Sequence, residues 1–517
     1  MQTSSSYQHF SPSVNLNLIP EMCHNEDDNQ FEGAIANNDA ELVEQQEIEF
    51  DSSDDEEGDG NVWVNIETTT GDQGRYLNVV YQVPEFGDVS QSNYAVCRDW
   101  GMHHTDQFDT VAVNEVFENK KQLLRAVNMW HIQNNYQYKM QRSNSDVIQL
   151  KCVKEPVYNW YLRAMKKEKL NVWKITVIRG QHTCTNVSLH QGHRQLDSEY
   201  IVEEVLPMVR ADLKINIAAI QAFASSQLQY PVSYKKAWKA KQKVIEKLFG
   251  TFEASYNVLP RLLQAIQVSN PGSVVNFNYK DIVSNRATFG RVFWAFWPSI
   301  VGFQSCHPLI SIDSTHLYGK YKGKLLIAVG YDADNGLFPL CFAIVDEESA
   351  DNWGWFIACI RSYVTDRRGI CVLSDRHAGI LAAMRDGWPE PFAYHRYCSR
   401  HFVSNFNTHF KDKDLKQAVV TMANEESKEN FDFWMSRVKD LNIVAWEYLN
   451  SAGKEKWSKA YDDGHRYGNM TTNMSEIFNS VLKGGRFLPI TALVQLTFYR
   501  CNKYFVKRRI EAEEFRL

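Results

Sequence analysis

Hydrophobic positions are unevenly distributed along the chain, and the change comes near residue 110. Before it, apolar residues are sparse, and the stretch Asp51-Ser-Ser-Asp-Asp-Glu-Glu-Gly-Asp-Gly60 contains none. Such a composition cannot bury enough apolar surface to fold, so residues 1–110 are predicted to be mostly disordered. Within them, residues 61–83 alternate well enough (Val62, Val64, Ile66) to predict one or two strands.

Residues 111–194 have the pattern of a small antiparallel domain. Leu123, Leu124, Val127 and Trp130 recur at helical spacing and predict a helix over residues 119–130. Turn-forming clusters then separate four strand-like runs, at residues 136–142, 147–153, 160–165 and 172–179.

Residues 195–270 are predicted to be helical. Apolar positions indicate helices over residues 200–209, 215–225 and 233–249, the last with Ser233 as its N-cap. Pro207 is expected to end or kink the first of them. The turn sequence Asn270-Pro-Gly-Ser273 marks the end of this region.

Residues 271–517 change to an α/β pattern. Strands are expected at residues 309–313, 325–331, 338–345 and 369–374, and helices at 352–364, 377–386, 400–465, 474–484 and 489–507. Three strands, a helix and a further strand predict an α/β fold with a mixed sheet.

Charge is divided in the same way as hydrophobicity. Residues 1–110 contain 23 acidic and two basic residues, a net charge of −21, whereas the remainder contains 39 acidic and 54 basic residues, a net charge of +15. Residues 111–194 alone carry 14 basic and five acidic residues. A basic body is typical of a protein that binds a polyanion such as DNA. The acidic segment is then either an arm that competes with DNA or a solvated spacer, and the six lysines of residues 233–249 either contact DNA or form a solvated face.

Other classes of protein are disfavoured. There is no run of 18 or more apolar residues, so no membrane span is predicted, and the first residues lack the basic and apolar regions of a secretory signal. The ten cysteines are scattered, which favours a reducing, intracellular compartment over a disulfide framework.

Two aspartates, Asp313 and Asp375, each end a predicted apolar strand. Ligands of α/β proteins gather beyond the carboxyl ends of strands, where two aspartates can share a divalent cation. A third acid would complete a two-metal site for chemistry at phosphorus, and oxygen ligands select Mg²⁺ or Mn²⁺. Aspartate after a strand is also a common turn residue, so this pattern alone leaves both interpretations open.

Motifs around these aspartates resemble those of the Mutator-like (MuDR-type) transposases. Ile312-Asp-Ser-Thr-His-Leu-Tyr-Gly-Lys320 is similar to the family's D-G-T-H-L motif, and Leu373-Ser-Asp-Arg376 follows in order. His395-Arg-Tyr-Cys-Ser-Arg-His401 resembles H-R-x-C-x-x-H, and Thr471-Thr-Asn-Met-Ser-Glu-Ile-Phe-Asn479 resembles T-x-N-x-x-E-x-x-N. The resemblance runs from about residue 111 to residue 517.

This resemblance implies a ribonuclease-H-like fold over residues 271–517, with a helical insertion at about 400–465. It also implies a catalytic triad of Asp313, Asp375 and Glu476 that holds Mg²⁺ or Mn²⁺. Other acids remain open for the third position: Glu347, Glu348, Glu425 and Glu426. Cys398 and His401 share a helix face at i, i+3, either as two metal ligands or as a packed motif that orients the insertion.

Residues 111–194 resemble the zinc-binding, WRKY/GCM-like DNA-binding domain of the same family. Cys152, His182 and Cys184 match three of its zinc ligands, and Trp160 matches its tryptophan. The second cysteine is missing, because Pro156-Val-Tyr-Asn159 occupies its place, so the Zn²⁺ set is incomplete or the finger is degenerate. If the finger survives, its strands present five basic residues to DNA: Lys151, Arg163, Lys166, Lys167 and Lys174.

Two functions follow from the resemblance. One is a transposase that binds transposon terminal repeats in the nucleus, as a monomer or homo-oligomer, and cuts and joins DNA strands with bound metal. The other is a DNA-binding transcription regulator without catalysis, like the domesticated far-red-impaired-response proteins. The family usually carries a further zinc-binding segment beyond the core. None of its motif precedes Leu517, and without it we expect weaker autonomous transposition.

Overall fold

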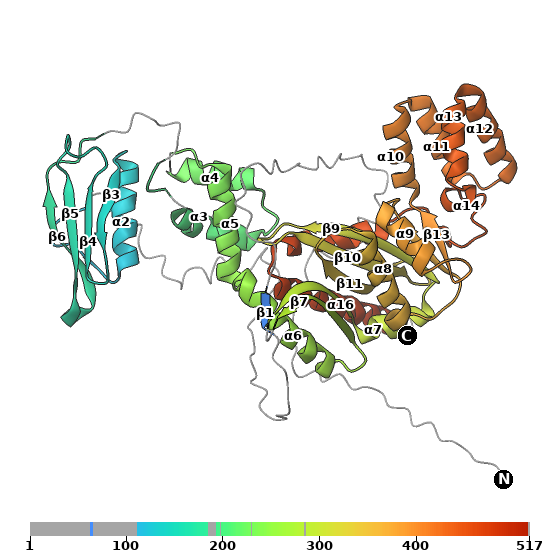
Figure 1. Cartoon of the computed structure of the whole chain (residues 1–517), viewed down its shortest axis with the longest axis horizontal. Helices are drawn as coiled ribbons and strands as arrows, with labels where there is room; N and C mark the ends of the chain where they lie inside the picture. Colours follow the sequence, from blue (N-terminus) through green and yellow to red (C-terminus); the bar gives the residue numbers. More distant parts are fainter. Residues whose placement is uncertain are drawn as a thin grey trace, which may run out of the picture. The chain divides into compact units, whose positions relative to one another are not determined.

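The computed structural model describes residues 63–65, 111–184, 193–196, 198–228, 230–283 and 286–514 (Figure 1). The predicted disorder of residues 1–110 falls almost wholly outside these ranges and stays a prediction. Only β1 (Trp63–Asn65) is described there, and it pairs antiparallel with β8. Within the described ranges, no helix has the length and apolar character needed to cross a membrane.

The first domain is a five-stranded antiparallel sheet with one helix packed on it. The sheet order is β2-β6-β5-β4-β3, which confirms the four predicted strands and adds a short fifth. Their bounds are β2 (Val116–Phe117), β3 (Tyr138–Ser143), β4 (Val147–Cys152), β5 (Tyr161–Lys167) and β6 (Val172–Arg179). Helix α2 (Lys120–Gln133) buries Leu123, Ala126 and Val127 against alternate residues of the sheet.

Four helices follow: α3 (Ser198–Ala211), α4 (Ile217–Leu228), α5 (Tyr234–Phe249) and α6 (Phe252–Ser269). Ser233 caps α5 as predicted, because its side chain accepts a hydrogen bond from the backbone N–H of Lys236. Pro207 lies inside α3 and does not end it.

Lysines of α5 make contacts within this helical region, among them Lys241, Lys243 and Lys247. Lys243 pairs with Glu199 at 2.5 Å and Lys247 with Glu203 at 3.2 Å. Lys241 is buried and donates to the carbonyl of Ile215 at 2.7 Å. These three lysines therefore hold helices together, and the face is neither wholly solvated nor wholly available to DNA.

The largest domain is built on an eight-stranded mixed sheet. Its order is β1-β8-β11-β10-β9-β12-β13, with β7 paired to β8. The bounds are β7 (Val274–Val283), β8 (Arg286–Ala295), β9 (Leu309–Leu317), β10 (Gly323–Tyr331), β11 (Leu337–Val345), β12 (Ile370–Ser374) and β13 (Ala393–Tyr397). Strands β8 to β11 pair antiparallel, whereas β12 is parallel to both β9 and β13. The mixed sheet is confirmed, but β7, β8 and β13 were not predicted.

Helices cover both faces of this sheet. One face packs on α8 (Ala350–Cys359), a π-helical turn (Ile360–Val364) and α9 (Ala378–Gly387), with Trp353 and Phe356 at the centre of the contact. The other face packs on α15 (Asn473–Val481) and α16 (Ile490–Glu514), since Phe342 stacks on Phe478 and Trp294 donates to Thr497. A short helix, α7 (Trp297–Gly302), follows β8.

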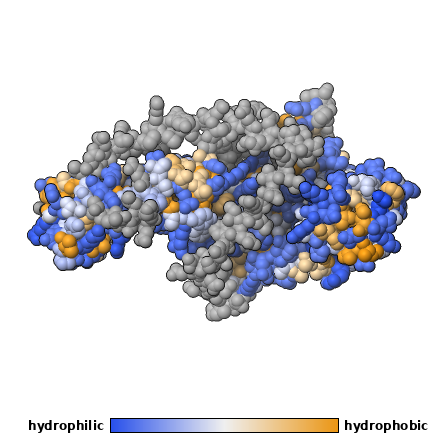
Figure 2. Space-filling model, turned by 90° about the horizontal axis from the view of Figure 1, so that it is seen from above, coloured by the Kyte–Doolittle hydropathy of each residue, from blue (hydrophilic) through white to orange (hydrophobic). Residues whose placement is uncertain are grey.

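The helical insertion predicted at residues 400–465 is present and has its own core. It consists of α10 (Ser399–Phe410), α11 (Lys413–Asn424), α12 (Lys428–Leu441), α13 (Ile443–Ser451) and α14 (Lys454–Trp457). Asp462 anchors its far end, because it accepts from both Arg396 and Arg466 at 3.1 Å with all three side chains at most 4% exposed. Hydrophilic and hydrophobic residues mix on the surface (Figure 2), and the exposed hydrophobic residues of the insertion include Phe433 and Leu441.

Candidate active site and metal-binding clusters

The two predicted aspartates lie side by side on neighbouring strands. In the parallel pair of β9 and β12, Leu373 is level with Ser311, and the same register continued by two residues puts Asp375 level with Asp313. Asp375 directly follows β12, as predicted. Asp313 does not end its strand, because residues 314–317 continue β9 by pairing with β10. The Ser-Thr-His stretch after Asp313, which we expected to lie beyond the strand, is part of the sheet.

Alternation along β9 decides what each side chain faces. Asp313 and Ser311 point to the α15 face of the sheet, where Ser311 bonds Ser475 at 3.0 Å and Asp313 Oδ2 accepts from Asn479 at 2.6 Å. Glu476 lies between these two helix residues, in the first turn of α15. The structure therefore brings Asp313, Asp375 and Glu476 near enough for their charges to interact, from three elements far apart in sequence. The tighter group of ligand atoms in this region, within 4.8 Å of one another, is Cys398, His401 and Glu476.

The pKa of Asp313 responds to the charges of the other two acids. Its pKa is raised to about 7, chiefly by burial, and the charges of Asp375 and Glu476 add to this rise. A hydrogen bond from the backbone N–H of Ser314 opposes it. Asp313 is half-buried and feels two other carboxylates, so a bound cation would stabilise it, and carboxylate oxygens are the ligands that Mg²⁺ and Mn²⁺ prefer.

The backbone of Asp375 is held by a half-buried histidine, His395, to which sequence reasoning gave no role. His395 Nε2 lies 2.8 Å from Ser374 Oγ, and that hydroxyl donates to the carbonyl of Asp375 at 2.6 Å. The backbone N–H of His377 in turn donates to Asp375 Oδ1 at 2.9 Å. Asp375 therefore has a fixed orientation before any metal binds.

Glu348, an alternative third acid, belongs to the opposite face of the sheet. It accepts a hydrogen bond from Ser314, the neighbour of Asp313, at 2.8 Å and pairs with Lys324 at 3.2 Å. Burial raises its pKa, but these partners together with His377 hold it below its ordinary value. Since Ser314 and Asp313 point to opposite faces, Glu348 does not join the acid cluster.

Two further alternatives lie in the insertion. Glu426 pairs with Lys459 at 2.6 Å, and Glu425 accepts from the backbone N–H groups of Glu426 and Ser427. Among the residues that the structure describes, Glu347 makes no hydrogen bond with Asp313. The geometry therefore favours Glu476 as the third acid.

Glu476 is also the meeting point of a second cluster. Ligand atoms of Cys398, His401 and Glu476 lie within 4.8 Å of one another. Burial raises the pKa of the Cys398 thiol, but the neighbouring His401 outweighs this and lowers it to about 7. The hydrogen bond with Cys398 in turn raises the pKa of His401 to about 9, and the charges of Glu476 and Asp375 add to this rise. Cys398 Sγ also accepts from the backbone N–H of Thr472 at 3.4 Å, so the motif ties the insertion to the start of α15.

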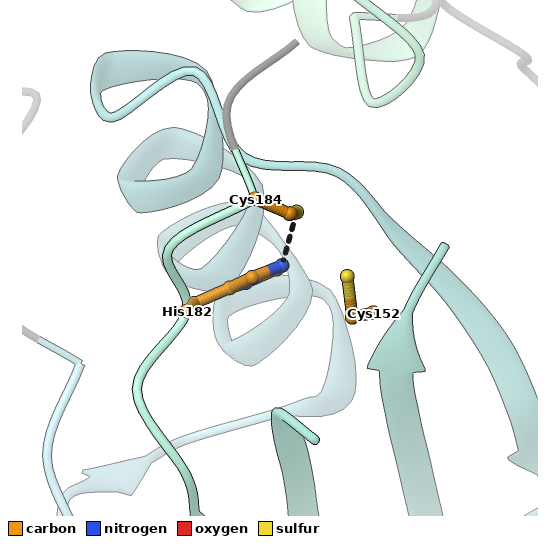
Figure 3. A group of neighbouring side chains, drawn as sticks. All are labelled: Cys152, His182 and Cys184. Carbon is orange, nitrogen blue, oxygen red and sulfur yellow. Dashed lines mark hydrogen bonds between the residues drawn. The ribbon is translucent and has the colours of Figure 1, made fainter. Parts of the chain in front are cut away.

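The predicted zinc ligands converge in the first domain (Figure 3). Cys152 ends β4, and His182 and Cys184 come from the segment after β6. Their ligand atoms lie within 4.8 Å of one another, all three side chains are buried, and Cys184 Sγ is 2.9 Å from His182 Nε2. Two thiols and an imidazole are donors that Zn²⁺ takes in structural sites, so this set fits the metal. In the part of the chain that the structure describes, no fourth Cys, His, Asp or Glu joins the group.

Comparison with known families identifies the region around the acids. Residues 309–405 match the family model of the MULE transposase domain. Residues 309–405 are thus similar to the MULE transposase domain. The matched segment contains Asp313, Asp375, Cys398 and His401, whereas Glu476 lies outside it.

Three curated proteins of Arabidopsis thaliana are similar to the chain beyond the MULE domain. "Protein FAR1-RELATED SEQUENCE 5" is 23% identical over 281 residues, 51% of this chain and 34% of its own length. "Protein FAR1-RELATED SEQUENCE 6" is 24% identical over 41% of this chain and 30% of its own, and "Protein FAR1-RELATED SEQUENCE 4" is 20% identical over 43% and 31%. The chain thus matches about a third of the length of these relatives.

The five predicted DNA-contact residues, far from the MULE domain in sequence, do not all share one sheet face. Their buried neighbours Leu150, Leu162 and Trp173 face α2. Alternation therefore places four of the basic residues on the face away from the helix: Lys151, Arg163, Lys167 and Lys174. Lys166 falls on the alternate positions of β5, the same ones as Leu162, so it is assigned to the α2 side of the sheet.

Two residues near the MULE acids, Asn479 and Arg400, were missed as functional residues. Both belong to motifs that the sequence contains, so the motifs could have pointed to them. Their roles, however, depend on contacts between residues far apart in sequence. Asn479 donates to Asp313, and Arg400 pairs with Glu476 at 2.6 Å.

Proposed function

We propose that this chain is a transposase-derived DNA-binding protein whose MULE domain cuts and joins DNA strands with bound Mg²⁺ or Mn²⁺. The observation that carries the proposal is the convergence of Asp313, Asp375 and Glu476, from β9, the end of β12 and α15. The core is proposed to be ribonuclease-H-like. The antiparallel run β11-β10-β9, continued by the parallel strands β12 and β13, supports that assignment.

The proposed chemistry divides between metal and protein. Bound divalent cations supply activation of an attacking oxygen and stabilisation of the leaving oxygen in an in-line displacement. Asp313, Asp375 and Glu476 hold these cations. Asn479 orients Asp313 through its amide, and the Ser374–His395 pair holds the backbone of Asp375. The protein thus contributes mainly positioning, which is the dominant protein contribution in phosphoryl transfer.

DNA binding is proposed for the first domain. Lys151, Arg163, Lys167 and Lys174 share one sheet face, and residues 111–194 carry a net excess of nine basic residues. Contacts from such residues to phosphates release counterions, so binding should weaken steeply with salt. We propose that Zn²⁺ on Cys152, His182 and Cys184 stabilises this domain, and that the protein acts on DNA in the nucleus.

A second candidate function is DNA binding without catalysis, as in a transcription regulator. The ion pair between Arg400 and Glu476 favours it, because this pair occupies one of the two oxygens that Glu476 would offer a metal. Catalysis therefore requires the metal to compete with Arg400 or to use the other oxygen.

Cleavage and binding by the purified full chain separate the two candidates. The proposal expects Asp313→Ala to abolish Mn²⁺-dependent nicking of supercoiled plasmid while salt-sensitive DNA binding, followed by fluorescence anisotropy, stays within about twofold. Glu348→Gln is the matched control, since it removes a neighbouring acid on the opposite face and should leave nicking in place. Binding without metal-dependent nicking by the unaltered chain would support the regulator instead.

A further inference from the structure

The ring of His182 is fixed on three sides. It stacks on Trp160 with ring centroids 4.4 Å apart and an interplanar angle of 14°, and on Tyr136 at 4.9 Å and 22°. Its Nε2 lies 2.9 Å from Cys184 Sγ, and its other nitrogen, Nδ1, lies 3.1 Å from Nε2 of His131. The two nitrogens therefore face different partners: Nε2 lies beside Cys184 (Figure 3), and Nδ1 lies beside a second histidine.

His131 lies on α2 and is fully buried. Its Nδ1 is 2.6 Å from the carbonyl oxygen of Val127, one helical turn earlier. A carbonyl only accepts, so Nδ1 of His131 carries a hydrogen and donates it, which leaves Nε2 of a neutral ring as an acceptor. Nδ1 of His182 then donates to that acceptor, and Nε2 of His182 keeps its lone pair for the space beside Cys184 and Cys152.

We propose that His131 is a positioning residue that fixes His182 in the tautomer and orientation needed to bind Zn²⁺ through Nε2. The inference rests on the proposed zinc site and deepens it. Ligating histidines generally donate their other N–H to a partner that orients the ring, and here that partner is an imidazole fixed by a helix carbonyl. We do not count His131 as a ligand, because its Nε2 meets Nδ1 of His182 and it does not belong to the group of ligand atoms formed by Cys152, His182 and Cys184.

A consequence for the domain is that zinc binding reaches helix α2. The ligands come from the end of β4 and from the segment after β6, and the hydrogen bond between the two histidines connects them to α2. A change at His131 should therefore loosen the metal without removing any ligand.

The test compares zinc retention in the full chain and in variants purified with Zn²⁺. Zinc content is measured by mass spectrometry, and the rate of zinc release is followed with a chromogenic chelator. Loss of an outer partner typically weakens metal binding about 10- to 100-fold, so His131→Ala should release zinc about that much faster than the unaltered chain. For His131→Gln, whose amide oxygen can accept from His182, the rate of zinc release should lie between those of the unaltered chain and His131→Ala.

Leu123→Ala is the control for a merely structural effect, since Leu123 is buried in the same core from α2 but has no polar atom that could orient His182. Leu123→Ala should lower the midpoint temperature of thermal unfolding but leave the rate of zinc release from the folded protein unchanged. Replacement of zinc by Co²⁺ adds a spectroscopic readout, in which His131→Ala should shift the ligand-field bands and Leu123→Ala should not.

Two results would overturn the inference, and they are distinguishable. If the unaltered chain holds one zinc that Cys152→Ser loses, but His131→Ala releases zinc at the unaltered rate, then the role of His131 is wrong while the zinc site stands. If the unaltered chain and Cys152→Ser both lack zinc and give no Co²⁺ bands, then the zinc site itself is wrong.

Discussion

Arg400 and Glu476 form an ion pair in which Nη2 and Oε2 are 2.6 Å apart. The other carboxylate oxygen, Oε1, accepts from Thr472 and faces His401 Nε2 at 3.8 Å. A cation bound at the acid cluster must therefore compete with Arg400 for Oε2 or use Oε1 in the presence of His401. This relationship makes Arg400 a determinant of metal affinity in the proposed site.

Removal of that competition should strengthen metal binding. For Arg400→Ala we expect the Mn²⁺ concentration at half-saturation to fall about three- to tenfold, equivalent to roughly 1 kcal/mol, because the arginine is partly exposed. Electron paramagnetic resonance of Mn²⁺ measures this without reference to activity. Arg385→Ala, which removes an exposed pair with Asp386, is the control. Weaker Mn²⁺ binding by Arg400→Ala would mean that the arginine supports the site.

The stability of the metal-free protein should depend on Asp313. The pKa of this aspartate is raised to about 7 by burial and by the nearby acids, whereas an unfolded aspartate has a pKa near 4. A raised folded-state pKa contributes stability that is full below about pH 4 and is lost as pH rises to about 7, at most about 4 kcal/mol from 1.36 kcal/mol per pH unit. Asp313→Asn should therefore raise the thermal midpoint of the metal-free protein at pH 8 and hardly change it at pH 4. An equal effect at both pH values would show that Asp313 does not titrate in this range.

Asn479 should matter for cleavage more than for folding. Its amide donates to Asp313 at 2.6 Å from a half-exposed position on α15. We expect Asn479→Leu to lower the nicking rate about 10- to 100-fold, the scale at which loss of an orienting partner acts on a metal site, with DNA affinity unchanged. The pH at which nicking is half-maximal should move upward, because Asp313 loses a donor that favours its charged form. An unaltered rate and pH profile would leave Asn479 with no positioning role.

The insertion should depend on its buried ion pairs. Asp462 bonds both Arg396 and Arg466, and its removal leaves Arg466 buried without an acid and Arg396 with only the more exposed Glu390. Asp462→Ala should lower the free energy of unfolding by about 3–5 kcal/mol, measured by chemical denaturation. Glu426→Ala removes an exposed pair with Lys459 and should cost less than about 1 kcal/mol. Similar costs for the two variants would show that the buried network adds little.

DNA binding should show which basic residues contact phosphates. Each lost phosphate contact lowers the slope of log affinity against log salt by about one, so Arg163→Ala and Lys174→Ala should each have this effect. Lys166→Ala, on the alternate position of β5, is the matched control and should leave the slope unchanged. If Lys166→Ala alone reduced the slope, DNA would bind the other side of the sheet.

The sequence predicts this fold well where apolar runs are unbroken. Buried runs such as residues 325–331 and 338–345 located β10 and β11, and helical spacing located α2 and α5. By contrast, β7 and β8 carry residues such as Asn276, Asn278 and Gly290 in their interiors, so their pattern does not stand out as a strand. Strand β13 is only five residues long and includes His395 and Arg396.

The residues of the candidate site likewise divide into those that the sequence could predict and those that it could not. Asp375 could be placed because an apolar strand ends there, and Glu476 came from a motif resemblance that spacing alone would not supply. The partners of these acids could not be predicted. Arg400 meets Glu476 across 76 residues, and His131 meets His182 across 51, so these pairs exist only once the chain has folded.

The central claim is that three acids form one metal-binding, DNA-cleaving site. The most direct test counts Mn²⁺ ions bound per chain by electron paramagnetic resonance, beside nicking, for the unaltered chain and Asp375→Asn. We predict that the unaltered chain binds Mn²⁺, that Asp375→Asn loses Mn²⁺ and nicking in parallel, and that Glu348→Gln keeps both. Equal Mn²⁺ binding by the unaltered chain and Asp375→Asn would contradict it.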